Sequence, residues 1–220
     1  MTFVNVGCRA PNDKGDMHAA LRDAPLPTRS HALVAIMKMQ TSPHDSVARY
    51  GAVAQAFHWL VAILVLVAFV YGPGGSEQRV YSATRDFDRQ LHETLGLGVL
   101  VLSALRLGWR LFDRQPDPEP VSRWMGLAAK AVQVLLYVLL FAVPLTAIAG
   151  AWLEGHPLTW LGGEIGPWVG KSHEVGARIA SLHGLLGDII LWVAGLHAVA
   201  ALYHHFVLKD GVLRSMTPGL

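Results

Sequence analysis

Four long apolar segments constrain this chain more than any other feature of its sequence. A helix that crosses the ~30 Å hydrocarbon core of a bilayer needs about 20 consecutive, mostly apolar residues. Four stretches reach that length, and linkers rich in Gly or Pro separate them: Ala52–Tyr71, Leu91–Phe112, Leu127–Leu153 and Ile179–Leu208. Pro144 lies inside the third segment and is expected to kink it, which neighbouring helices tolerate in a membrane. The sequence therefore predicts an all-α fold, a four-helix transmembrane bundle.

The composition agrees with residence in a lipid bilayer. Charged residues make up only 15% of the chain, against about 25% in ordinary soluble domains. The formal net charge of +2 is small, and no interleaving of basic and aromatic residues indicates nucleic-acid binding. Cys8 is the single cysteine, which excludes an internal disulfide and a cysteine metal cluster.

The positions of Lys and Arg predict the orientation of the bundle. The N-terminal region, the connection between the second and third segments and the C-terminus together hold 13 of the 18 basic residues. Because short loops rich in Lys and Arg stay on the cytoplasmic side, we expect both termini to be cytoplasmic.

Residues 1–48 differ from the rest of the chain. They have mixed polarity, scattered Pro and Asp, and no sustained hydrophobic period. Their one apolar patch, Ala32–Met37, lacks the length and the cleavage site of a signal peptide. We therefore predict a disordered extension over 1–48 and a transmembrane domain over 49–216.

Four histidines lie inside the apolar segments at depths that agree with one another. His183 and His197 are 14 residues apart in the fourth segment, which places them within ~40° of one helix face and ~21 Å apart along the axis. His58 lies one turn into the first segment on the cytoplasmic side, and His92 opens the second segment on the opposite side. Depth therefore pairs His58 with His197 and His92 with His183, as two haems stacked across a membrane require. The third segment has no histidine and is expected to be a scaffold.

The residue one turn after each of these histidines is small. These residues are Ala62, Gly96, Gly187 and Ala201. Because residues four apart share a helix face, a small one leaves space beside the imidazole. Gly96 and Gly187 in particular are expected to make room for a porphyrin.

Other roles for membrane histidines compete with haem ligation. A single histidine often packs or forms an interhelical hydrogen bond. A proton relay would need carboxylates at depth, and only Asp188 lies inside a segment. A zinc site would need three converging ligands, which the spacing does not supply. Four histidines at paired depths favour haem over these alternatives.

Three further residues lie near the two expected sites. His204 shares the face of His197 at the cytoplasmic interface, where it could contact a propionate or a quinone, or anchor the helix. Arg85 and Arg89 belong to a basic group around the mouth of the His92/His183 site. They could pair with propionates or steer an anionic donor, or could be ordinary solvated charges.

Several short motifs contain the expected ligands or follow them in the same segments. They are Phe57-His58-Trp59-Leu60, Leu91-His92-Glu93-Thr94-Leu95-Gly96, Leu105-Arg106-Leu107-Gly108-Trp109-Arg110, Leu196-His197-Ala198 and Ala201-Leu202-Tyr203-His204-His205-Phe206. Together they resemble the prokaryotic cytochrome b561 family, the small membrane dihaem cytochromes, over about residues 49–216.

The resemblance implies two low-spin b haems, each held by two of His58, His92, His183 and His197. It also implies a bacterial inner-membrane location and electron exchange with ubiquinone or another quinone. Some members look like superoxide oxidases, which pass an electron from periplasmic superoxide to ubiquinone. Larger relatives are quinone-reacting cytochrome subunits of hydrogenases and formate dehydrogenases, which act with a redox partner protein. Because two histidines fill both axial positions, either function would use outer-sphere electron transfer.

Overall fold

The computed structural model describes residues 49–72, 77–113 and 122–217. These described residues belong to one compact unit of the chain. The disordered extension predicted for residues 1–48 lies outside the described residues.

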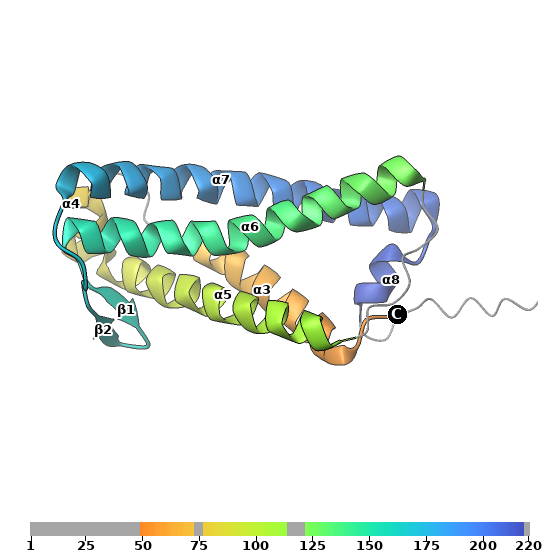
Figure 1. The fold of residues 1–220 in the computed structure, drawn as a ribbon, viewed down its shortest axis with the longest axis horizontal. Coiled ribbons are helices and arrows are strands. Elements are labelled where there is room, and N and C mark those ends of the chain that lie inside the picture. The colour runs from red at the N-terminus through yellow and green to blue at the C-terminus, as the bar shows by residue number, and fades with distance from the viewer. Residues whose placement is uncertain (1–48, 73–76, 114–121, 218–220) are drawn as a thin grey trace, which may run out of the picture. The chain divides into compact units, whose positions relative to one another are not determined.

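Four long helices form the framework of this unit (Figure 1). They are α3 (Ala52–Val70), α5 (Asp86–Phe112), α6 (Arg123–Glu154) and α7 (His173–Tyr203). Each is long and apolar enough to cross a membrane, so the predicted four-helix transmembrane bundle is confirmed. Shorter elements connect or follow them: α4 (Glu77–Val80), the 3-10 helix η1 (Ala83–Arg85), β1 (Leu158–Trp160), β2 (Gly163–Ile165), the π-helix η2 (His204–Leu208) and α8 (Val212–Met216).

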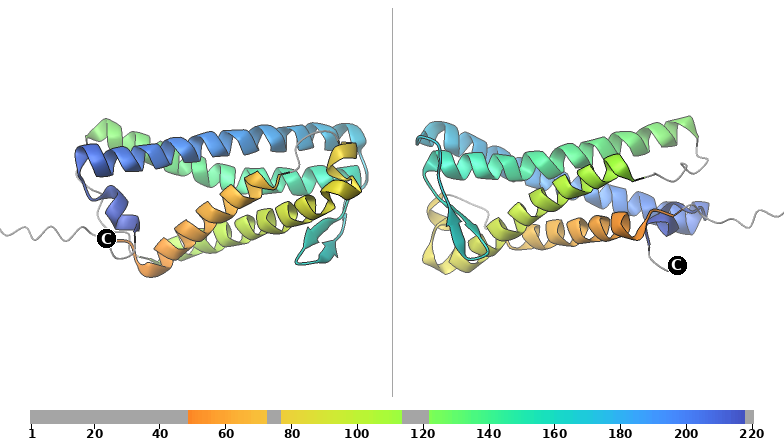
Figure 2. Two further views of the ribbon diagram at one scale, coloured as in Figure 1. Left: turned by 180° about the vertical axis from the view of Figure 1, so that it is seen from behind. Right: turned by 60° about the horizontal axis from the view of Figure 1, so that its bottom comes forward.

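The long helices pack in two pairs around a small apolar core. Helix α3 packs against α5 and α6 against α7, as the views in Figure 2 also show. Val61, Val99, Leu139 and Ile190 contribute one buried core residue from each helix. Large apolar side chains also face outward, and Trp192 is 75% exposed. A bundle that is apolar on the outside as well as the inside is suited to lipid.

The helices extend beyond the apolar segments of the sequence. Helix α5 begins at Asp86 rather than at Leu91, and α7 begins at His173 rather than at Ile179. The added turns carry carboxylates, which favour the positive end of the helix dipole. Hydropathy marks only the part of a helix that suits lipid, and therefore could not predict these polar turns.

The α6–α7 connection contains a small antiparallel hairpin that the sequence did not predict. Its strands β1 and β2 pair Leu158 with Ile165 and Trp160 with Gly163. In Figure 1 the hairpin lies beside the first half of α5. Its strands of three residues each are too short to produce a recognisable alternation of apolar and polar residues.

The C-terminal segment is bonded to the start of α3. The side-chain amide of Gln55 donates to the Ser215 carbonyl at 3.1 Å, and the Trp59 indole N–H donates to the Met216 carbonyl at 2.9 Å. These bonds hold the first turns of α3, and with them His58, against the region of α8.

Candidate haem-binding sites

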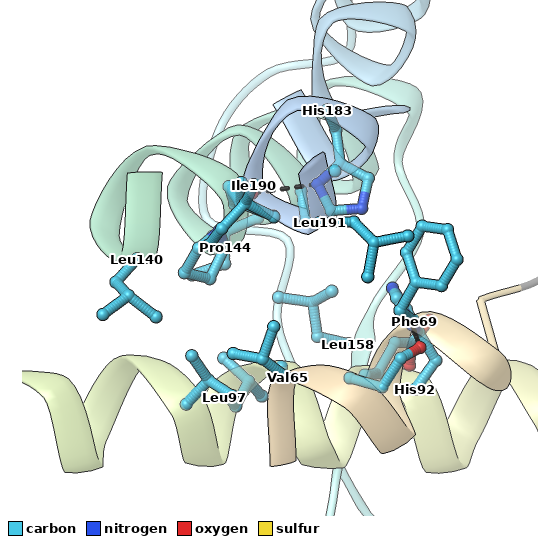
Figure 3. A pocket seen from close by; sticks show the side chains of 18 residues that line it. Val65, Phe69, His92, Leu97, Leu140, Pro144, Leu158, His183, Ile190 and Leu191 are labelled. Atoms are coloured by element: carbon cyan, nitrogen blue, oxygen red, sulfur yellow. Dashed lines mark hydrogen bonds between the residues drawn. The ribbon is translucent and has the colours of Figure 1, made fainter. Parts of the chain in front are cut away.

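His92 and His183 face each other from α5 and α7 (Figure 3). Their ring centroids are 5.9 Å apart and the rings are inclined by 76°. The Nδ1 atom of His92 lies 2.7 Å from the Ala68 carbonyl, and that of His183 lies 2.9 Å from the Val143 carbonyl. Because a carbonyl only accepts, both Nδ1 atoms carry the proton. Each ring is thereby held in the tautomer whose Nε2 can bind a metal.

Backbone carbonyls from two other helices orient these imidazoles. Ala68 lies in the last turn of α3, where carbonyls lose their intrahelical donors, and the Gly72 amide bonds to Phe69 instead. Val143 lies in α6, next to Pro144. The third apolar segment, expected to be only a scaffold, therefore also orients His183. Hydrogen bonds from main-chain carbonyls have no side-chain signature, so sequence analysis missed them.

An apolar cavity lies beside this pair. Cofactor pockets are typically largely apolar as well. Gly96 and Gly187 line it, and a Cβ atom built on either glycine would meet no atom within 4 Å. The two glycines thus open onto free space beside the imidazoles, as a flat macrocycle requires.

His58 and His197 form a second facing pair, from α3 and α7. Their ring centroids are 6.4 Å apart and the rings are inclined by 78°. The Nδ1 atom of His58 lies 3.3 Å from Nη2 of Arg106. A guanidinium only donates, so Nδ1 of His58 is here the acceptor and Nε2 carries the proton. This pair differs from the first, because an arginine occupies the place that a carbonyl takes there.

Both pairs pass a simple test for a metal held between two imidazoles. Two metal–nitrogen bonds of ~2 Å place the centroids of facing imidazole rings ~6 Å apart, which both observed separations match. Among the residues that the structure describes, no three His, Cys, Asp or Glu side chains converge as a bare metal would need. Two axial nitrogens alone suit a metal that brings its own equatorial ligands, as haem iron does.

Arg85 and Arg89 are both engaged with carboxylates near the His92/His183 pair. Arg85 pairs with Asp88 at 3.0 Å, and Arg89 pairs with Glu93 at 2.9 Å and also with Asp86. The two arginines are thus accompanied by three carboxylates. An anion would meet a cluster whose positive charge is already neutralised.

Glu93 also binds the hairpin. Its Oε2 accepts from the Thr159 amide at 2.7 Å, and the next residue, Thr94, donates its hydroxyl to the Thr159 carbonyl at 3.4 Å. Leu158, beside Thr159, is buried and lines the cavity. The hairpin therefore closes one wall of the His92/His183 cavity, with Glu93 as its main attachment.

Replacing Glu93 with Ala is expected to loosen the hairpin. A hydrogen bond to a charged group contributes about 1.5–3 kcal/mol, so the Thr159 amide should exchange its hydrogen at least tenfold faster. Hydrogen-exchange mass spectrometry of the segment around β1 measures this. Glu164→Ala changes an exposed carboxylate in the same hairpin and should leave the exchange unaltered. Equal protection in both variants would show that Glu93 does not hold the hairpin.

His204 lies in the π-helix η2, where its Nδ1 is 2.5 Å from Oδ2 of Asp210. The other oxygen of Asp210 accepts from the Val212 amide at 3.1 Å. The carboxylate thus fixes the orientation of His204 at the end of α7. Sequence analysis singled out His204 but not Asp210, whose role depends on the turn between η2 and α8.

A membrane bundle with two facing histidine pairs at different depths is the architecture of a membrane cytochrome b. The chain belongs to the prokaryotic cytochrome b561 family, whose model matches residues 49–219. It is a membrane electron-transfer protein, and the family implies b-type haem as its cofactor.

Several curated proteins are similar to this chain over most of their length. "Cytochrome b561 homolog 2" of Escherichia coli K12 is 31% identical over 170 residues, which cover 76% of this chain and 90% of the relative. A Yersinia pestis protein named "Probable superoxide oxidase CybB" is 32% identical over 177 residues, with 77% and 96% covered. "Cytochrome b562" of Cereibacter sphaeroides is 32% identical over 168 residues, with 73% and 90% covered.

Proposed function

We propose that this chain binds two b-type haems and moves electrons across the bilayer to or from the quinone pool. His92 with His183 would hold one haem, and His58 with His197 the other. The observation that carries the proposal is the presence of two facing imidazole pairs, with centroids 5.9 and 6.4 Å apart, in one bundle. Along α7 the two pairs are separated by 14 residues, or ~21 Å of helix.

The residues of the chain have distinct parts in this function. The paired histidines would hold each haem from both sides and would leave no position at which oxygen could bind the iron. The carbonyls of Ala68 and Val143 orient two of these rings, and the walls of the cavity, Leu158 among them, are largely apolar. Bound b-type haem supplies one-electron redox chemistry.

A relative and the position of His204 support the proposed electron donor and acceptor. The Yersinia relative is named a probable superoxide oxidase, which supports superoxide as the donor. The proposed acceptor is ubiquinone or another quinone, as the resemblance to the family implies. His204, oriented by Asp210, is the candidate contact for the quinone or for a propionate. We give Arg85 and Arg89 a smaller role in propionate pairing or anion steering than the sequence suggested, because both already pair with carboxylates.

The purified chain in proteoliposomes with ubiquinone tests this function. It should carry two haems, become reduced when superoxide is generated outside, and form ubiquinol. If superoxide leaves the haems oxidised and a copurifying dehydrogenase reduces them, the chain is instead the cytochrome subunit of a larger complex. A colourless purified protein would contradict both functions.

We also propose that the protein lies in the bacterial inner membrane with both termini in the cytoplasm. The support is the excess of Lys and Arg in the terminal regions and in the α5–α6 connection. A green fluorescent protein fused after Leu220 should therefore fluoresce, and alkaline phosphatase fused there should be inactive. Active phosphatase at that position would show that the C-terminus lies outside the cytoplasm and would contradict the proposed orientation.

A further inference from the structure

Helix α5 carries an arginine where α7 carries its second histidine. His92 and Arg106 are 14 residues apart, the same spacing as His183 and His197 on α7. This spacing brings both residues close to one face of α5 and separates them by ~21 Å along the axis. Because His92 faces His183, Arg106 reaches the depth of the second pair, where it contacts His58.

A second arginine lies one turn further along α5. Arg106 and Arg110 both lie over the ring of Tyr137 on α6, with 5.6 and 5.8 Å from the guanidinium carbon to the ring centroid. With the Gln133 amide turned so that its oxygen faces Arg110, that oxygen accepts from Nη1 at 2.5 Å and from Nη2 at 3.2 Å. Neutral groups of α6 therefore contact both guanidinium groups, and Arg106 also contacts His58.

These two cations have no anionic partner among the residues that the structure describes. Within the described part of the chain, no carboxylate oxygen lies within 4 Å of a guanidinium nitrogen of Arg106 or Arg110. Like charges four residues apart on a helix repel each other, and charges in membrane helices normally find a partner. Ser103, on the same side of α5, is fully buried and its hydroxyl has no hydrogen-bond partner. The two guanidinium groups and the Ser103 hydroxyl could therefore bind an anion or a hydrogen-bond acceptor that the described residues do not supply.

The chemistry of the neighbouring histidine pair indicates which anion fits. A b-type haem carries two propionate carboxylates, and the planar guanidinium of arginine matches a carboxylate with two parallel hydrogen bonds. Arg106 donates to Nδ1 of His58 and leaves the proton on Nε2, the atom that would bind iron. A carboxylate beside Arg106 would draw the guanidinium away and permit the metal-binding tautomer.

We propose that Arg106 and Arg110 form a carboxylate-binding subsite that holds a propionate of the haem at His58 and His197. This inference rests on the proposed function, because it presupposes a haem at that pair. It assigns the two arginines a role in cofactor binding that their positions near a membrane interface do not by themselves require.

Binding of haem and of haem dimethyl ester, whose propionates carry no charge, tests the proposal. The measurement uses the full-length His92→Ala chain, so that only the His58/His197 pair is complete. Haem should bind at least tenfold more tightly than the ester, since charge-assisted hydrogen bonds are lost with the ester. Arg106→Gln and Arg110→Gln should each weaken haem binding and reduce the preference over the ester. Arg123→Gln, an exposed arginine at the start of α6, should preserve it.

Several results would overturn the proposal. Equal affinities for haem and ester in the parent, or equal loss of both in the arginine variants, would show that the arginines only support the fold. The arginine substitutions could instead change haem affinity by an amount that depends on the anionic lipid content and not on esterification of the haem. That result would show that Arg106 and Arg110 bind a lipid phosphate. If Arg106→Gln does not fold, Arg106→Lys serves as the second variant. It keeps the positive charge and should retain part of the preference for haem over the ester.

A second readout separates this proposal from the function on which it rests. A cation beside the haem favours the reduced state, so Arg106→Gln should lower the midpoint potential of the haem at His58 and His197 and leave the other haem unchanged. If His58→Ala spares both haems, the proposed function fails at this pair. If His58→Ala removes one haem but the arginine variants change neither potential nor preference, only the propionate subsite fails.

Discussion

Replacing either His92 or His183 with Ala is expected to lower the haem content from two per chain to one. A backbone carbonyl holds each ring with its Nε2 free to bind a metal. Each variant would keep only one of the two imidazoles proposed to hold this haem. His58→Ala and His197→Ala should remove the other haem in the same way. Haem-to-protein stoichiometry and the redox difference spectrum of each purified variant measure the loss.

Two histidines outside the bundle core provide the controls. His156 stacks on Tyr81, and His173 bonds to Glu154 at the exposed start of α7. His156→Ala and His173→Ala should keep both haems. A variant of any of the four paired histidines that retains both haems would show that its assignment as a ligand is wrong.

Leucine at Gly96 or Gly187 is expected to empty most of the His92/His183 site. A Cβ at either position meets nothing within 4 Å, so the larger side chain has room to enter the cavity. There it would occupy the space proposed for the porphyrin. The result should be a haem-to-protein ratio close to one in each variant, with the spectrum of the other haem intact.

Gly184 offers a matched control for these substitutions. It lies on α7, one residue after His183, and a Cβ there also meets nothing within 4 Å, but Gly184 is exposed and does not line the cavity. Gly184→Leu should therefore bind two haems. Full occupancy in Gly96→Leu and Gly187→Leu would remove the steric argument while leaving the histidines as candidate ligands.

The bundle and the meeting of the four histidines could be predicted because both depend on regular helices. Hydropathy over 20 residues marks a transmembrane helix, and the 14-residue spacing of His183 and His197 determines a helix face. Arg106 carried the same signal, since it follows His92 by 14 residues. A spacing argument for metal ligands applies to histidines, however, and gives no role to an arginine at the same position.

Other parts of the site depend on contacts that no local pattern contains. Glu93 reaches Thr159 across 66 residues of sequence, and the hairpin that holds Thr159 is too short to show a strand period. The ion pairs of Arg85 and Arg89 depend on the polar first turn of α5, which hydropathy placed outside the helix. The sequence shows that both residues are basic. Their ion pairs could be predicted only by knowing that α5 begins at Asp86.

The different partners of the imidazole Nδ1 atoms make the two histidine pairs chemically unequal. At His92 and His183 main-chain carbonyls accept from Nδ1, which leaves Nε2 free to bind a metal. At His58 the guanidinium of Arg106 donates to Nδ1, which favours the other tautomer. A site whose competent state is less populated has a lower apparent affinity. In a titration of the protein with haem, the His92/His183 site should therefore fill at a lower haem concentration than the His58/His197 site.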